Sequence, residues 1–171
     1  ADALSKALTD GSLDMAAPVS ASTATGLNGK DGLTVKEGAT TDKVLLAYNN
    51  GTDSLLSDEQ ARKSFRYQID AAGIASAQPD TAGALGGPIS PLEPGYEDLT
   101  GLYPHDENQA GKMFSYFGAQ YLTTVNLVVP EEYRSLAETI KQQIERQPRP
   151  TVNLEVLSDE DYAKRIKDGK W

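Results

Sequence analysis

Hydrophobic positions change their spacing along residues 122–171 in the order strand, helix, strand, helix. Residues 124–129 are rich in β-branched side chains and are closed by Pro130, which is typical of a short buried strand. Residues 131–144 then repeat apolar side chains at helical spacing, and residues 152–157 alternate with a period of two. A strand, a helix and a second strand within about thirty-five residues match the size of a βαβ unit, whose two strands run parallel.

The remainder of the chain predicts further helices and strands around this unit. Capping residues and apolar stripes predict helices over residues 2–8, 57–73, 106–117 and 158–168. Ser57, Asp106 and Ser158 are the expected N-caps of the last three. Alternating patterns predict strands over residues 13–17, 33–37 and 43–48, and residues 18–32 predict a loop with about one helical turn. We therefore expect an α/β fold in which a mixed sheet is flanked by helices.

Residues 78–102 form an irregular stretch that is rich in proline and glycine. So long a stretch without a period is uncommon inside a compact domain and is usually either functional or a linker. Its apolar side chains, among them Leu85, Ile89 and Tyr96, are too numerous for a free linker. We expect an ordered loop that packs over the surface of the domain.

Composition and charge narrow the classes of function. The 171 residues are 39% hydrophobic and 24% charged, which is ordinary for a globular protein. The net charge of −9, from 16 basic and 25 acidic residues, argues against nucleic acid as a partner, because phosphate binding needs a basic surface. The sequence has no apolar stretch near the roughly 18 residues needed to span a bilayer, and no signal-peptide pattern.

Reactive side chains are scarce. The chain has no cysteine, which excludes disulfides and thiol chemistry but leaves the compartment open. His105 is the single histidine, and its place between Pro104 and Asp106 indicates a loop or helix-start residue. We therefore expect no catalytic group, no metal site and no cofactor.

Four segments of the chain carry a resemblance to a known family. Residues 7–15 read Ala-Leu-Thr-Asp-Gly-Ser-Leu-Asp-Met, similar to a family segment of leucine, two residues, glycine and then leucine-aspartate. Residues 45–50 are similar to its leucine-alanine-phenylalanine-asparagine strand, residues 57–70 to its helix ending in isoleucine-aspartate, and residues 88–95 to its proline-rich crossover. In this order, the segments resemble the peptide- and nickel-binding family of extracellular solute-binding proteins of ABC importers.

The resemblance covers part of a complete member, which is longer and has two lobes. Residues 1–48 resemble the end of the first lobe and the strand that crosses between the lobes, and residues 49–171 resemble the first part of the second, C-terminal lobe. Residues 166–169 also repeat the pattern of residues 8–11, where a helix closes on Asp-Gly before the next element. We therefore expect an internal fragment, although two helices that merely share a common C-cap would give the same repeat.

The resemblance implies the substrate-binding component of an ABC importer, which captures an extracellular peptide or similar small solute between two lobes. Its implied partners are that ligand and a permease in the membrane. Its implied location is extracellular, either lipid-anchored at the cell surface or periplasmic. An oligopeptide, a dipeptide, a nickel chelate and a sugar all stay open as ligands.

Four residues that follow predicted strands are the candidate ligand contacts. Asn49 and Asn50 follow one strand, and Tyr133 and Arg134 follow another. In α/β folds, ligands lie near the ends of parallel strands and the turns after them. Arg134 could pair bidentately with a ligand carboxylate, and Tyr133 could stack or donate a hydrogen bond. Alternatively, Arg134 is a solvated helix residue near Glu138, Tyr133 anchors the core, and Asn49 forms a turn.

Two other classes of function compete with a receptor. A doubly wound enzyme would need a glycine-rich loop between a strand and a helix, and residues 83–87 lack both neighbours. The carboxylates at Glu131 and Glu132, and those in residues 159–161, are the ordinary acidic first turn of a helix. A structural or adhesive cell-surface module without a transport role is the remaining alternative.

The isolated chain is also expected to self-associate. In the two-lobed interpretation, residues 44–48 and the strand at 152–157 lose the neighbours that would cover them. Exposed apolar surface and an open strand edge both favour pairing with another chain.

Overall fold

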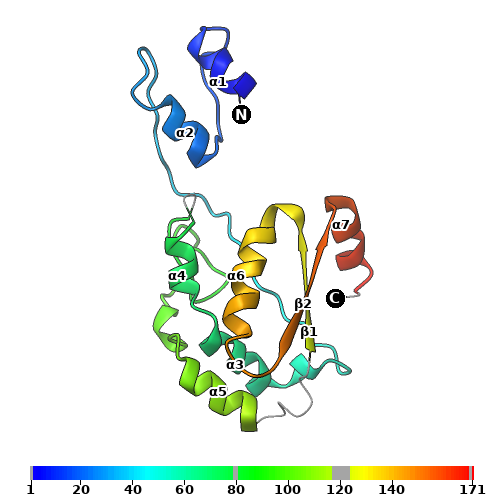
Figure 1. Cartoon of the computed structure of the whole chain (residues 1–171). Helices are drawn as coiled ribbons and strands as arrows, with labels where there is room; N and C mark the ends of the chain where they lie inside the picture. Colours follow the sequence, from blue (N-terminus) through cyan, green and yellow to red (C-terminus); the bar gives the residue numbers. More distant parts are fainter. Residues whose placement is uncertain (1, 79–80, 117–123, 170) are drawn as a thin grey trace.

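The computed structural model of the chain describes residues 2–78, 81–116, 124–169 and 171. Over these residues it is a mixed α/β structure with seven α-helices and one two-stranded parallel sheet (Figure 1). The α-helices are α1 (Asp2–Thr9), α2 (Ala21–Leu27), α3 (Glu59–Gln68), α4 (Ala71–Ser76), α5 (Glu107–Tyr116), α6 (Arg134–Ile144) and α7 (Asp159–Lys167). The 3-10 helices are η1 (Leu55–Ser57), η2 (Thr100–Leu102) and η3 (Glu131–Tyr133), and the strands are β1 (Thr124–Pro130) and β2 (Thr151–Leu157).

The two strands lie side by side and run parallel, which confirms the predicted βαβ unit. Their register begins with Thr124 opposite Thr151 and continues to the last residue of each strand. α6 connects the strands and packs against both of them (Figure 1). Ile144 of α6 and Val152 of β2 lie in the same buried cluster, so the unit contributes directly to the core.

The core lies where α3 and α5 meet the βαβ unit. Phe65 of α3 and Phe114 of α5 are 2% and 4% exposed, and their ring centroids lie 5.1 Å apart in an edge-to-face arrangement. Ala110 is fully buried beside them. Because edge-to-face aromatic pairs add to the stability that comes from area burial alone, this contact helps to hold α3 and α5 together.

The start of α3 differs from the prediction. Asp58, and not Ser57, is the N-cap: its Oδ1 accepts hydrogen bonds from the backbone N of Gln60 at 2.6 Å and of Ala61 at 3.4 Å. Ser57 instead ends η1. A carboxylate that reaches two free amides and favours the positive end of the helix dipole is the better cap at this position.

The helix predicted to run to residue 73 is divided into two. α3 ends at Gln68, and Asp70 caps α4 by accepting a hydrogen bond from the backbone N of Gly73 at 2.9 Å. An Asp side chain that bonds the backbone ahead of it competes with continuation of a helix. The chain therefore turns between the two helices at Asp70.

Two other predicted caps are confirmed. Asp106 accepts a hydrogen bond from the backbone N of Gln109 at 2.8 Å at the start of α5. Ser158 Oγ accepts from the backbone N of Asp161 at 3.2 Å and donates to Asp161 Oδ2 at 2.9 Å, so Ser158 is the N-cap of α7.

The predicted strands at residues 13–17, 33–37 and 43–48 are wrong, and so is the mixed sheet over the described residues. None of these segments pairs with another, and the 7-residue helix α2 forms within residues 18–32, where a loop with about one helical turn was predicted. A segment with strand composition becomes a strand only when a second segment satisfies its backbone groups. Residues 43–48 therefore run extended, and the side chains of Val44, Leu45 and Leu46 are 60%, 59% and 38% exposed.

The irregular loop at residues 81–99 folds back onto its neighbours. Ser90 is buried, and an added Cβ at Gly86 would lie 2.2 Å from the backbone of Leu99, so two parts of the loop touch at a glycine. Lys43 Nζ donates to the Pro88 carbonyl at 2.8 Å and forms an ion pair with Glu93. The loop therefore contacts its neighbours, but Ile89, Leu92 and Tyr96 are exposed, so the prediction that its apolar side chains pack over the domain surface is confirmed only in part.

Candidate functional site

Asn49 and Asn50, the first predicted pair, make contacts within the chain. Asn49 Nδ2 donates to the carbonyl O of Trp171, and Asn49 Oδ1 accepts from the backbone N of Gly51 at 2.9 Å. Asn50 Oδ1 accepts from Arg62 Nη1 at 2.9 Å. Asn49 is thus a turn former that also holds the end of the chain.

Tyr133 and Arg134, the second pair, lie where η3 passes into α6. Arg134 Nε and Nη2 donate to the two carboxylate oxygens of Glu131 at 2.7 Å each, which is a bidentate pair on the protein surface. The hydrogen bonds from Arg134 lower the pKa of Glu131. Glu138 acts on Arg134 only through a weaker electrostatic attraction. A ligand carboxylate would therefore have to displace Glu131.

The two predicted pairs flank opposite ends of α7. Asn49 contacts Trp171, which follows the end of α7. Burial is the largest cause of the raised pKa of Tyr133, followed by the neighbouring Glu132. Tyr162, in the first half of α7, adds a smaller electrostatic effect. The two pairs share no contact residue: Asn49 and Asn50 contact Trp171, Gly51 and Arg62, whereas Tyr133 and Arg134 interact with glutamates of their own segment and with Tyr162.

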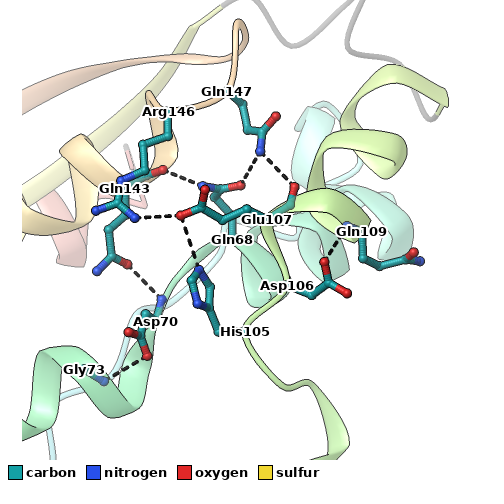
Figure 2. Close-up of polar contacts among 10 residues, drawn as sticks. All are labelled: Gln68, Asp70, Gly73, His105, Asp106, Glu107, Gln109, Gln143, Arg146 and Gln147. Carbon is teal, nitrogen blue, oxygen red and sulfur yellow. Dashed lines mark hydrogen bonds and ion pairs between the residues drawn. The ribbon is translucent and has the colours of Figure 1, made fainter.

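The amide side chains of Gln68 and Gln143, which are buried, and of Gln147, which is half-buried, join α3, α5 and the end of α6 (Figure 2). Gln68 is fully buried: its Nε2 donates to the carbonyl of Gln143 at 2.6 Å, and its Oε1 accepts from Gln147 Nε2 at 2.9 Å. Gln147 Nε2 also donates to the Glu107 carbonyl at 2.9 Å. A buried amide that lost these partners would be costly, so the cluster holds the three helices in one arrangement.

Charged residues surround this amide cluster at its edge. Glu107 Oε1 accepts from Arg146 Nη1 at 2.6 Å and lies 3.6 Å from His105 Nε2, while Asp70 donates its backbone N–H to Gln143 Oε1 at 2.8 Å (Figure 2). His105 directly precedes the N-cap of α5, as expected from the sequence. Because these polar atoms face one another, we assign the cluster a structural role.

A basic pocket on α3 escaped the sequence analysis. It is shallow, has a volume of about 210 Å³, and is lined by Tyr48, Glu59, Arg62, Lys63, Arg66 and Tyr103. The available signal was the spacing of Arg62, Lys63 and Arg66, which places three cations within one turn of a helix in an acidic chain. The two tyrosines could not be foreseen, because they come from segments far apart in the sequence.

A second pocket lies beside α7, and the positive and negative side chains that line it are equal in number. Its volume is about 300 Å³, and it is lined by Leu157, Asp161, Lys164, Arg165 and Asp168. Arg165 pairs with Glu155 at 2.6 Å. Two carboxylates and two cations line this pocket, so its field favours neither cations nor anions.

Metal ligands and membrane helices are not found in the part of the chain that the structure describes. No group of three or more histidine, aspartate or glutamate side chains there could hold a metal ion. None of the described helices has the length and apolar character needed to cross a membrane.

Comparisons of the chain with protein-family models and with curated proteins gave no match. The resemblance to solute-binding proteins therefore rests on the four sequence segments and stays a prediction.

Proposed function

We propose that the chain is part of the substrate-binding component of an ABC importer. It would capture a peptide or similar small solute between two lobes and deliver it to a membrane permease, outside the cell or in the periplasm, without a catalytic step. The observation that carries the proposal is the extended segment at residues 43–48, which exposes Val44, Leu45 and Leu46. Apolar side chains exposed side by side usually mark a surface that another body covers.

The position of this segment supports a covering lobe. It ends at the expected boundary between residues 48 and 49, where the chain would pass from one lobe to the other. Beyond that boundary the chain builds a βαβ unit, in which β1 leads into η3 and β2 leads into α7. Solute sites in α/β folds lie at such strand ends, where Tyr133 and Arg134 are placed.

Arg134 is the residue whose change tests ligand contact at this edge. In the complete receptor, Arg134→Ala should weaken peptide binding by about tenfold or more, as expected for a lost charge-assisted hydrogen bond. Arg149→Ala is the matched control, because Arg149 is exposed on the turn between α6 and β2. Calorimetry that gave equal affinities for both variants would remove Arg134 from the ligand site.

Native mass spectrometry of the complete protein tests the function itself. A receptor should retain small peptides or solutes through purification, and these should dissociate on denaturation. A structural or adhesive module, which the exposed apolar segment would also fit, should carry no small molecule and should instead bind another macromolecule.

The 171-residue chain by itself gives a second test. It should self-associate through its uncovered apolar segment and should bind no peptide at micromolar strength, because one lobe buries only one side of a ligand. A strictly monomeric chain in light scattering that bound a library peptide at micromolar concentration would contradict the two-lobed mechanism.

A further inference from the structure

We propose that the basic pocket on α3 is a binding site for a small organic anion, in which a carboxylate meets two arginines and a short apolar body lies against two tyrosines. This site lies apart from Tyr133 and Arg134 and does not depend on the proposed receptor function. Its evidence is the state of the two guanidinium groups, the chemistry of the walls and the size of the pocket.

Arg62 is held in place through a single nitrogen. Its Nη1 donates to Asn50 Oδ1 at 2.9 Å and to the carbonyls of Leu56 at 2.7 Å and Ser57 at 2.8 Å. All three acceptors are neutral, so they orient the guanidinium without cancelling its charge. Among the described residues, Nε and Nη2 have no partner, which leaves one edge of the guanidinium open to a carboxylate.

Arg66, one turn further along α3, is held in a similar way. Its Nη2 donates to the Gly86 carbonyl at 3.3 Å, and its guanidinium carbon lies 5.0 Å from the centre of the Tyr103 ring. Tyr103 is itself supported by an edge-to-face contact with Tyr67 at 5.6 Å. The cation–π contact and the carbonyl bond hold the guanidinium beside the ring, and neither partner carries a negative charge.

The other charges of the pocket cancel each other. Lys63 Nζ pairs with Glu59 Oε1 at 2.6 Å, and Glu59 also attracts Arg62 electrostatically, more weakly than it attracts Lys63. Three cations and one carboxylate line the pocket, so its net charge is positive. Elsewhere in the described chain, three arginines form ion pairs with glutamates, and a fourth, Arg149, lies on an exposed turn. Arg62 and Arg66 differ from these four because neutral oxygens and an aromatic ring orient their guanidinium groups.

Two tyrosines add an apolar wall and no negative charge. Tyr48 stacks at a tilt on Phe65 of the core, with ring centroids 6.1 Å apart. Burial raises the pKa of Tyr48 to about 12, while the nearby Arg66 opposes that shift. The phenol is thus neutral at physiological pH and does not repel an anion.

The volume of the pocket limits what it can hold. About 210 Å³ is below the roughly 300–1,000 Å³ of sites for drug-sized ligands, so one ring or a few carbons fill it. The guanidinium edges alone would accept phosphate as well as carboxylate. The tyrosine walls favour an organic body over an inorganic ion, because only the former buries apolar surface there.

Benzoate is a suitable probe for this site. In NMR titrations of the isotope-labelled chain at constant ionic strength, benzoate should shift the amides of residues 59–68 with saturation. Benzamide is a neutral molecule of the same shape, and acetate lacks the ring. Each should bind with an affinity at least about tenfold lower than that of benzoate. Inorganic phosphate should also bind more weakly than benzoate. Equal binding of benzamide, or phosphate binding as tight as that of benzoate, would overturn the proposal.

Substitutions distinguish binding in this pocket from a nonspecific attraction of benzoate to positive charge elsewhere on the protein. Arg66→Gln should reduce the affinity for benzoate about tenfold, and Arg66→Lys, which keeps the charge but loses the planar fork, should reduce it by a smaller factor. Lys36→Gln makes the same change of charge on the exposed N-terminal segment and should leave the affinity unchanged. Equal losses in Arg66→Gln and Lys36→Gln would overturn the proposal. If Arg66→Gln alters the spectrum outside α3, Tyr103→Leu, which removes the ring beneath Arg66, gives the same test.

Discussion

Two regions of this chain have similar helix-forming sequence patterns, but their side chains are buried to different extents. Residues 2–50 form two short helices, α1 and α2, which contact each other and lie away from the rest of the molecule (Figure 1). In this N-terminal region, Thr23 and Leu27 are the only buried residues among those described. Residues 51–171, the packed region, contain the sheet and the aromatic core. A short helix can form from local signals, whereas a strand also needs a partner that only packing supplies.

The N-caps of the two regions make the comparison direct. Ser20 caps α2 by accepting from the backbone N of Thr23 at 3.3 Å, and Ser158 caps α7 in the same way at 3.2 Å. The cap chemistry is equal, but α7 packs on both strands while α2 packs on α1. Equal local interactions should therefore contribute unequally to global stability.

The largest expected difference concerns buried apolar side chains. Phe65→Ala should lower the free energy of unfolding by about 3–5 kcal/mol, because it leaves a cavity beside Phe114. Leu27→Ala, at a residue equally buried within the N-terminal region, should leave the main urea transition in place. Urea denaturation followed by tyrosine and tryptophan fluorescence measures both. Equal shifts would show that the two regions unfold as one unit.

The amide cluster should give the next largest effect. Gln68→Ala leaves the Gln143 carbonyl and the Gln147 amide without their buried partner, which should cost about 1–3 kcal/mol. Gln142→Ala, one residue before Gln143 on the exposed side of α6, is the matched control and should change little. A Gln68→Ala variant as stable as the control in thermal denaturation would mean that the cluster does not hold the helices together.

The paired N-caps should differ by a smaller amount. Ser158→Ala should lower the global stability by about 1 kcal/mol, the usual cost of a lost N-cap. Ser20→Ala should reduce only the helical circular dichroism contributed by α2, without moving the main transition. A loss of global stability in Ser20→Ala equal to that in Ser158→Ala would refute the division into two regions.

The smallest expected effect concerns one of the contacts between the regions, the ion pair of Lys43 with Glu93. Hydrogen bonds from Lys43 and from the Ser90 amide lower the pKa of Glu93 from its ordinary value of 4.5 to about 2. A lowered pKa in the folded state stabilises the chain above pH 4.5, and this contribution is lost as the pH falls from 4.5 towards 2. Carbon NMR of the Glu93 carboxyl should show that low midpoint.

The same contact can be removed at neutral pH. Glu93→Gln should make residues 36–42 more sensitive to proteolysis, because Lys43 loses its ion pair with the packed region. Glu97→Gln is the control, since Glu97 is an exposed glutamate of the same loop. If cleavage rates were the same in both variants, another contact would have to hold the N-terminal region.

The elements that the sequence predicted well are those with strong local signals. Asp106 and Ser158 supply caps, and the β-branched run at residues 124–129 lies one helix away from a second strand. The basic pocket was harder to predict from the sequence. Of the lining of the basic pocket, only the cations of α3 follow from spacing along the sequence, because Tyr48 and Tyr103 reach it from two distant segments.

The sequence by itself determined the start of the capped helices α5 and α7, the order of elements in the βαβ unit and the acidic balance of charge. Caps and periodic patterns depend on neighbours within a few residues, and the balance of charge depends on composition alone. Tertiary structure decided whether residues 43–48 would be a strand. Their strand-like composition has no partner within the described chain, so the segment runs extended with Val44 and Leu45 exposed. Tertiary structure also decided that Arg62 and Arg66 would face neutral oxygens and an aromatic ring while Arg134 pairs with Glu131. The physical reason is the same in both cases: a backbone edge or a charged side chain has many possible partners, and only the folded chain determines which one lies within reach.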